Sequence, residues 1–173
     1  VRGAQCILGN HELSVIRGKP KGYNQWFFSD EGRWEPKEGH FVDMTLLPSD
    51  EQEDVRAFFE SLPLALERED LRVVHACWDS WAIGQARSAE RSILELYNDG
   101  PENTIAKPEA LKREAPLTHR DDEWERAEED TQNKNVVAVL TSGKERRAVH
   151  DDEIIWSGDQ WRPLVRVRWW EEY

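Results

Sequence analysis

The first apolar positions of the chain predict a strand followed by a short helix. Residues 1–8 close on a short apolar run, which is typical of a strand when turn residues bound it. Residues 11–17 carry a second apolar run, and we expect a short helix there. Gly9-Asn10 stands between the two runs and is a turn signal. The pattern predicts a strand-to-helix junction, and ligand sites of open α/β sheets collect at such junctions.

Residues 49–62 repeat apolar side chains with helical periodicity. Ser49 and Gln52 stand in capping-box spacing at the start of this segment, and Pro63 ends it. The apolar stripe, which we expect to face the core, consists of Val55, Phe58, Phe59 and Leu62. The preceding residues 18–47 are rich in glycine, aromatic and charged residues and predict an irregular segment.

Short β-branched and aromatic runs on either side of turn residues predict two hairpins. Residues 64–67 and 71–76 read as paired strands joined by a charged turn. Residues 153–156 and 161–165 flank a Ser-Gly-Asp-Gln turn and read in the same way. We therefore expect short antiparallel strands in both halves of the chain.

The second half of the chain alternates apolar and highly charged segments. Residues 83–97 have a helical apolar face, and Asp99-Gly100-Pro101 stops that helix. Residues 121–132 are charged and predict either an exposed helix or a mobile segment. Residues 136–140 form a continuous apolar run, which favours a buried strand. The fold class that follows is α/β or α+β.

Composition excludes some partners. The net charge of −12 argues against non-specific binding to nucleic acid or to an anionic membrane surface, and no apolar run approaches the length of a membrane span. The two cysteines, Cys6 and Cys77, provide no disulfide framework, so we expect reduced thiols in a cytoplasmic protein. Nine tryptophans predict mainly packing, with stacking on a base or a sugar as the alternative.

Two blocks carry the chemistry. Gly9-Asn10-His11-Glu12 presents an amide oxygen, an imidazole and a carboxylate at the predicted junction. Val74-His75-Ala76 ends a predicted strand in a second imidazole. Taken singly, a Gly-Asn pair is also a common helix cap, and a histidine at a strand end is also a common core residue. Two strand ends that each deliver an imidazole can also converge on one site.

Together these blocks resemble the third and fourth signature blocks of the calcineurin-like metallophosphoesterase superfamily, Gly-Asn-His-Glu and Val-His-Ala/Gly. The two opening blocks of that family, Gly-Asp-x-His-Gly and Gly-Asp-x-x-Asp-Arg-Gly, are missing from residues 1–173, and so is its closing Gly-His block in the expected order. The only methionine is Met44. We therefore expect an internal portion of a longer enzyme.

The resemblance implies a fold and a domain organisation. It predicts part of a four-layer αββα sandwich with mixed sheets, formed by residues 1–173 as one incomplete domain. Residues 77–135 would form a charged helical cap or insertion within it. An isolated portion would expose strand edges that normally pair, so we expect a homo-oligomer if the chain is truncated.

The resemblance also implies roles for single residues. Two divalent ions, of manganese, iron or zinc, would activate a hydroxide for attack on a phosphoryl group. Asn10 and His75 would be metal ligands, and His11 would be the catalytic proton donor or electrostatic stabiliser. Gly9 would allow the tight turn, and Glu12 would have a structural role or support the metal ligands. The function implied is hydrolysis of a phosphate monoester or a phosphoanhydride.

The segment after His75 resembles bacterial phosphoesterases that are similar to protein phosphatases or to dinucleoside tetraphosphate hydrolases. The substrate classes that follow are a phosphorylated small molecule, a dinucleoside polyphosphate or a phosphoprotein. A short polar segment follows the predicted strand: Thr141, Ser142 and Gly143. One interpretation is that it lines a phosphate pocket, and the other is that it is a plain turn. Two alternatives to an enzyme are a non-catalytic fragment and an acidic, tryptophan-rich interaction module.

Overall fold

The computed structural model describes residues 3–20, 24–28, 45–113 and 115–172, as a mixture of helices and short antiparallel strands. The fold class is therefore α+β, within the range that the sequence predicts. The chain divides into two compact units, Val1–His75 and Ala76–Tyr173, which are described separately. Within the described residues, no helix combines the length and the apolar character that crossing a bilayer requires.

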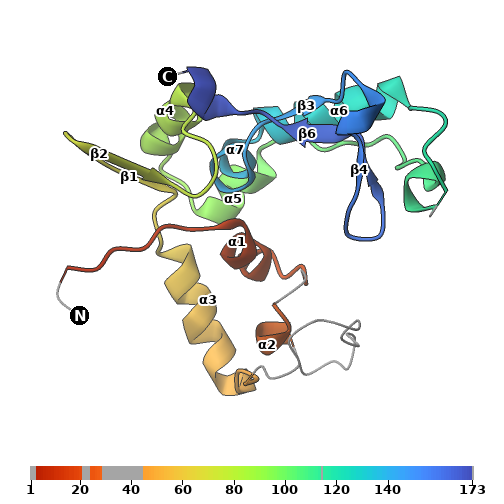
Figure 1. Ribbon diagram of the computed structural model, residues 1–173. Helices are drawn as coiled ribbons and strands as arrows, with labels where there is room; N and C mark the ends of the chain where they lie inside the picture. The colour runs from red at the N-terminus through yellow and green to blue at the C-terminus, as the bar shows by residue number, and fades with distance from the viewer. Residues whose placement is uncertain (1–2, 21–23, 29–44, 114, 173) are drawn as a thin grey trace. The chain divides into compact units, whose positions relative to one another are not determined.

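The first unit contains three helices, a 3₁₀ turn and a hairpin among its described residues (Figure 1). These elements are α1 (Asn10–Ile16), α2 (Gln25–Phe28), η2 (Ser49–Glu51), α3 (Gln52–Glu60), β1 (Ala65–Arg68) and β2 (Leu71–Val74). The two strands are antiparallel, with Ala65 opposite Val74 and Arg68 opposite Leu71, which confirms the predicted hairpin. The predicted helix after Gly9-Asn10 is also confirmed.

The core of the first unit forms around α1. Leu13, Val15 and Ile16 are buried on this helix, and α3 packs against it. Arg56 of α3 donates from Nη1 to the carbonyl oxygen of Ile16 at 3.2 Å, and its guanidinium lies 5.5 Å from the ring centre of Phe27. The guanidinium thus satisfies a carbonyl at the C-terminal end of α1, which has no partner inside the helix.

Three predictions for the first unit are wrong. Residues 3–8 do not form a strand: one backbone bond, from Leu8 N–H to the Pro63 carbonyl at 2.9 Å, holds the end of this segment. An apolar run becomes a strand only where a partner supplies a ladder of hydrogen bonds. The α3 stripe is not buried either, and Phe58 is 55% exposed. Ser49 begins the 3₁₀ turn rather than capping α3.

The second unit contains most of the helical residues and two small sheets. Its elements are α4 (Ser80–Ser88), α5 (Ile93–Asn98), η3 (Glu109–Lys112), α6 (Asp122–Lys134), α7 (Val136–Ser142), β3 (Glu145–Arg147), η4 (Asp151–Glu153), β4 (Ile155–Trp156), β5 (Trp161–Arg162), β6 (Leu164–Arg166) and η5 (Trp169–Glu172). Strand β3 pairs with β6 and β4 pairs with β5, both antiparallel, so the second predicted hairpin is confirmed. Helix α6 confirms the helical alternative for residues 121–132.

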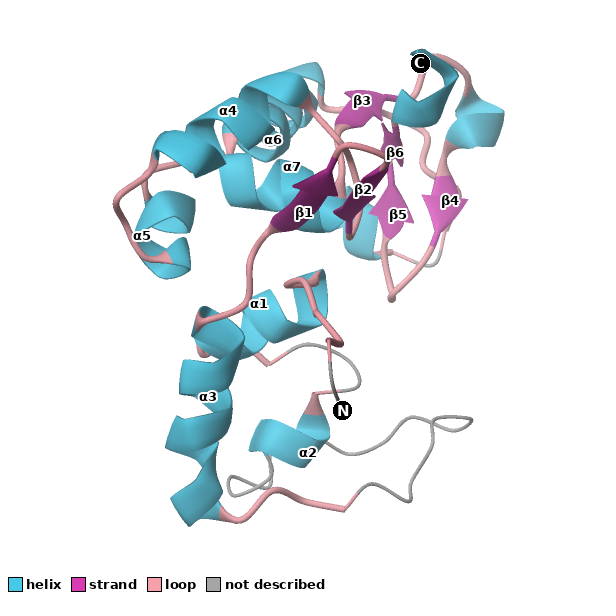
Figure 2. Ribbon diagram, turned by 90° about the vertical axis from the view of Figure 1, so that its left-hand side faces the viewer, coloured by secondary structure: helices cyan, strands magenta, loops and turns pink. Residues whose placement is uncertain are grey.

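Helix α7 is the centre of the second unit. The sequence predicts a strand for residues 136–140 of this helix. Residues 136–141 are all buried, and α4, α5 and α6 pack against the helix (Figures 1 and 2). Asn135 caps it by accepting from Ala138 N–H at 3.0 Å. A short, continuous apolar run suits a helix that is buried on every side as well as a buried strand. The strand prediction for residues 136–140 is therefore wrong.

The predicted helix over residues 83–97 is two helices. Helix α4 ends at Ser88, and Ala89 has an extended backbone with φ −78° and ψ 119°. Ser92 then begins α5 with a capping box: its Oγ accepts from Glu95 N–H at 3.2 Å, and its own N–H donates to Glu95 Oε2 at 2.8 Å. Reciprocal capping favours a new start at this point. The predicted stop after residue 98 is confirmed.

A buried ion pair joins α6 to the segment before it. Glu125 is 1% exposed, and Arg120 donates to its carboxylate from Nε at 3.0 and 3.1 Å and also from Nη2. The same guanidinium donates from Nη1 to the Ala148 carbonyl oxygen. The carboxylate is thereby compensated in a place that water does not reach.

Removing the arginine leaves that carboxylate buried without its cation. We expect Arg120→Ala to lower the free energy of unfolding by about 3–5 kcal/mol, measured by urea denaturation. The control is Lys134→Ala, which removes the exposed pair with Asp130; we expect it to cost about 1 kcal/mol or less. Equal effects of the two substitutions would contradict the assignment of Arg120 as the buried partner.

Candidate functional site

The N-terminus of α1 organises the candidate site in the first unit. Gly9 caps the helix with an extended backbone, and its carbonyl oxygen accepts from Leu13 N–H at 3.0 Å. The carboxylate of Glu12 folds back and accepts from Gly9 N–H at 3.1 Å. A carboxylate in the first turn is favourable because the N–H groups there have no partner inside the helix. Glu12 thus holds the turn that precedes Asn10 and His11.

His75 follows β2 directly and lies against Gly9. A methyl group added at Gly9 would lie 2.9 Å from Cε1 and 3.0 Å from Nδ1 of the His75 ring, and 2.7 Å from Glu12 Oε2. Gly9 is buried, whereas His75 is exposed overall. The fold therefore brings together the two blocks that the sequence analysis selected, and the imidazole occupies space that the missing side chain leaves.

His11 is held by a residue that the sequence analysis did not select. Its Nδ1 lies 3.2 Å from Oδ1 of Asn24, which immediately precedes α2 and is 3% exposed. Nδ2 of Asn24 donates to the His11 carbonyl oxygen at 2.9 Å and to Ser14 Oγ at 2.5 Å. An asparagine in an irregular segment carries no periodic or motif signal, so only the folded chain reveals this contact.

The donors present are compatible with part of a metal site. Asn10, the half-buried first residue of α1, offers an amide oxygen, and His75 offers ring nitrogens beside the neighbouring Gly9. Mixed oxygen and nitrogen donors suit manganese, iron and zinc. Among the described residues, no three histidine, cysteine, aspartate or glutamate side chains gather closely enough to hold an ion. Asn10 and His75 thus offer one oxygen and one nitrogen donor, fewer than a complete ligand set.

Thr141, Ser142 and Gly143 belong to the second unit and do not form a loop after a strand. Thr141 is fully buried in α7 and donates from Oγ1 to the Val137 carbonyl oxygen at 2.7 Å. Gly143 ends the helix with φ 86°, and its carbonyl oxygen accepts from Gln132 Nε2 at 2.7 Å. The hydroxyl of Thr141 and the backbone of Gly143 therefore serve the packing of α7.

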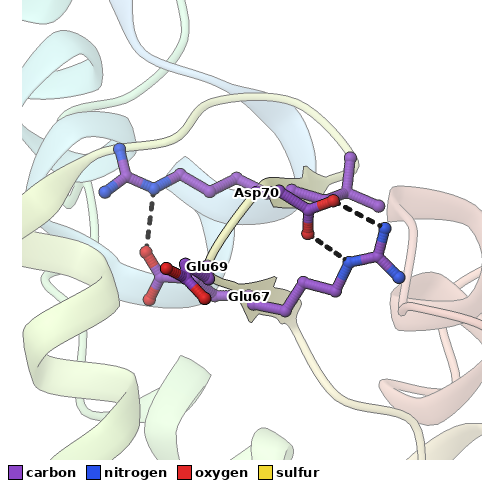
Figure 3. A pocket seen from close by; sticks show the side chains of 6 residues that line it. Glu67, Glu69 and Asp70 are labelled. Carbon is purple, nitrogen blue, oxygen red and sulfur yellow. Dashed lines mark hydrogen bonds and ion pairs between the residues drawn. The ribbon is translucent and has the colours of Figure 1, made fainter.

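The β1–β2 hairpin carries an open hollow lined by six consecutive residues, 67–72 (Figure 3). Arg68 donates to Asp70 at 2.5 and 3.2 Å, and Arg72 donates to Glu67 at 2.8 Å. Figure 3 shows Glu69 beside these pairs. Arg68, Asp70 and Arg72 are more than half exposed and Glu67 is 28% exposed, and ion pairs at such a surface stabilise a fold weakly. The hollow is therefore a weak candidate for a functional site.

Three basic residues that follow α7 in the second unit are paired with carboxylates. Arg146 binds Glu153 through both terminal nitrogens, and Arg147 contacts Asp122 and Glu129. Lys144 binds Asp79, the residue that caps α4. Burial opposes ionisation of Asp79, but the hydrogen bonds from Lys144 and from Ala82 N–H outweigh it and lower the pKa of that carboxyl.

Comparison with known proteins provides no further guide to the site. The chain matches no protein-family model, no curated protein and no solved structure. The assignment of function therefore depends on the residues themselves and on their geometry.

We expect Gly9→Ala to push the His75 ring away from the start of α1. The backbone of Gly9, with φ −107° and ψ 178°, is one that alanine also adopts, so the effect comes from lost space. The readout is the NMR contact between the His75 ring protons and residue 9, which the substitution should remove. Stability should fall by about 1 kcal/mol because alanine is a poorer helix cap than glycine, and by a further amount because the His75 ring is displaced.

The matched control for this substitution is Gly84→Ala in α4. A methyl group there meets nothing within 4 Å, so the change should stabilise the helix by roughly 0.5–1 kcal/mol. In a His75→Ala background, Gly9→Ala should cost measurably less than in the parent chain. An unchanged contact between His75 and residue 9 in Gly9→Ala would contradict the packing of the imidazole on Gly9.

The Arg146–Glu153 pair predicts a specific acid sensitivity. The bond from Arg146, followed by that from Val149 N–H, lowers the pKa of Glu153 from 4.5 to about 2. A lowered carboxyl pKa contributes stability that is present above the unfolded value and is lost as the pH falls from 4.5 towards 2. Glu153→Gln should therefore flatten the fall of the unfolding free energy in that pH range. An equally steep fall in the variant would show that other groups cause it.

Proposed function

We propose that this chain is part of a calcineurin-like metallophosphoesterase, a metal-dependent enzyme that hydrolyses a phosphate monoester or a phosphoanhydride. The observation that carries the proposal is the contact of His75 with Gly9, beside Asn10 and His11. All four residues belong to the two blocks that the family resemblance selects from distant places in the chain. The contact between Gly9 of one block and His75 of the other supports a shared site.

Asn10 and His75 would bind a divalent ion, the first through its amide oxygen and the second through a ring nitrogen. Two such ions, when bound, would supply a hydroxide nucleophile and neutralise the phosphoryl oxygens. Gly9 would keep the space into which the His75 ring fits, and Glu12 would hold the turn through its bond to Gly9 N–H. A stable site requires more than two ligands, so residues 1–173 alone should bind metal weakly.

His11 would act on the leaving oxygen of the substrate. Its contact with Asn24 restrains the ring at Nδ1, and the imidazole would donate a proton or stabilise the developing negative charge. The remaining ligands would be aspartates of the two opening family blocks, which residues 1–173 lack. In such an enzyme the chain would form part of a four-layer sandwich in the cytoplasm, with manganese, iron or zinc as the metal.

The test uses the chain extended upstream through its own coding sequence. We expect hydrolysis of p-nitrophenyl phosphate that depends on Mn²⁺ and stops with a chelator. Asn10→Ala and His75→Ala should raise the Mn²⁺ concentration needed for half-maximal activity. His11→Asn should lower kcat by about 10²–10⁴. His119→Ala, which changes an exposed histidine on a loop, should leave the rate unchanged.

Three outcomes would contradict the proposal. One is an extended chain without aspartate-rich blocks before Val1, which favours the acidic interaction module. Another is a folded extended chain without metal-dependent hydrolysis, which favours a non-catalytic fragment. The last is hydrolysis that persists in His11→Asn and His75→Ala, which would place the active site elsewhere. Dinucleoside polyphosphates and a phosphopeptide, assayed beside p-nitrophenyl phosphate, separate the substrate classes.

A further inference from the structure

The second unit has a cavity of about 460 Å³ that is lined by residues of β3, of β6 and of the segment after β6 (Figure 1). The lining residues are Arg146, Arg166, Val167, Arg168 and Glu171. Three guanidinium groups thus line the cavity against one carboxylate. The chain as a whole has a net charge of −12, so this cavity is a local exception to its acidic character.

The hollow of the β1–β2 hairpin is an internal comparison for this charge balance. Its charged lining residues are Glu67, Glu69 and Asp70 against Arg68 and Arg72. Three carboxylates therefore outnumber two guanidinium groups there, and the sign of the lining charge is opposite to that of the second-unit cavity. A concave surface concentrates ligands of the opposite charge. Of these two hollows, only the one in the second unit suits an anion.

The strands place two of the three arginines on the same side of the chain. Val167 N–H donates to the Lys144 carbonyl oxygen at 3.0 Å, which continues the pairing of β6 with β3 by one residue. Side chains two positions apart on an extended strand point to the same face, and Arg166 and Arg168 have this spacing. Arg146 comes from the neighbouring strand β3. Both strands thus contribute guanidinium groups to the cavity.

Two of these guanidinium groups are held by carboxylates that do not line the cavity. Arg146 donates to Glu153 from both terminal nitrogens, and Arg166 Nη2 lies 3.4 Å from Glu145 Oε1. These contacts restrain the side chains, so less conformational entropy is lost when a ligand binds. A guanidinium has five N–H donors, and more donors are present than these contacts use.

The third guanidinium is bound by the carboxylate of the cavity itself. Arg168 Nη1 donates to Glu171 Oε1 at 3.2 Å, and the two side chains are 72% and 59% exposed. An exposed pair of this kind is weak, so an anion with more charge can replace the carboxylate. Glu171 thus occupies the position beside Arg168 that an anionic ligand would take.

We propose that this cavity binds the phosphate group of a small phosphorylated molecule. A phosphate monoester carries about two negative charges and three terminal oxygens, which match three guanidinium groups opposed by one carboxylate. Guanidinium groups bind phosphate through paired N–H bonds. Ligand pockets measure about 300–1,000 Å³, so a cavity of about 460 Å³ also accommodates an organic part. The site shares no residue with the Gly9–His75 site, and the proposal does not depend on the proposed function.

Calorimetric titration of the full chain with phenyl phosphate tests the proposal. A chelator is present throughout, so that no metal ion contributes to binding. We expect saturable binding of phenyl phosphate and weaker binding of benzoate, which has the same ring and one charge. Inorganic phosphate should also bind more weakly, because it leaves part of the cavity empty. Absence of phenyl phosphate binding would overturn the proposal, and equal affinities for inorganic and phenyl phosphate would overturn the organic ligand.

Two variants of opposite sign locate the binding. Arg168→Gln should weaken phenyl phosphate binding about tenfold, because charge-assisted bonds are lost. Glu171→Gln removes the competing carboxylate and should strengthen binding about threefold, a gain that loss of folding cannot produce. The control is Arg68→Gln, which changes an arginine that is 69% exposed and paired with Asp70. An equal loss in Arg68→Gln, unchanged affinity in Arg168→Gln or weaker binding in Glu171→Gln would overturn the site.

Discussion

The missing side chain of Gly9 is the constraint on which the candidate site depends. A β-carbon there would collide with the His75 imidazole and the Glu12 carboxylate, both of which lie closer than ordinary contact distance to its position. The backbone angles of Gly9 are ordinary, so the requirement is for space and not for conformational freedom. The glycine lets a residue that follows β2 reach the first turn of α1.

In the second unit, a glycine also leaves space for a polar side chain that packs against a helix end. A β-carbon at Gly100 would collide with the Asn135 side chain, whose Nδ2 donates to the Tyr97 carbonyl oxygen at 2.8 Å while its Oδ1 caps α7. One buried asparagine thereby joins the end of α5 to the start of α7. In both units a glycine without a side chain lets a polar group from elsewhere in the chain lie against a helix end, where backbone groups lack partners.

Asn24 and Asn135 illustrate how buried amides organise this acidic chain. Each is 3% exposed and uses its donor and its acceptor on different groups. A buried amide that satisfies both ends specifies geometry, because any rotation leaves a polar group unpaired. For Asn24 the geometry specified is the position of the His11 ring beside the start of α2. For Asn135 it is the start of the most buried helix.

Sequence patterns alone determined the features that depend on neighbouring residues. The helix after Gly9-Asn10, the β1–β2 hairpin and the hairpin around Ser157-Gly158 follow from turn residues and short apolar runs that act locally. The choice of the Gly9–Glu12 and His75 blocks also came from sequence, as residue types in a recognisable order.

Tertiary structure decided the features in which a residue depends on partners far away in the sequence. Residues 136–140 became a helix once three other helices surrounded them, and residues 3–8 found no ladder to make them a strand. Asn24 gained its place beside His11 only when the chain brought it there, since a hydrogen bond between residues 13 positions apart leaves no periodic trace in the sequence.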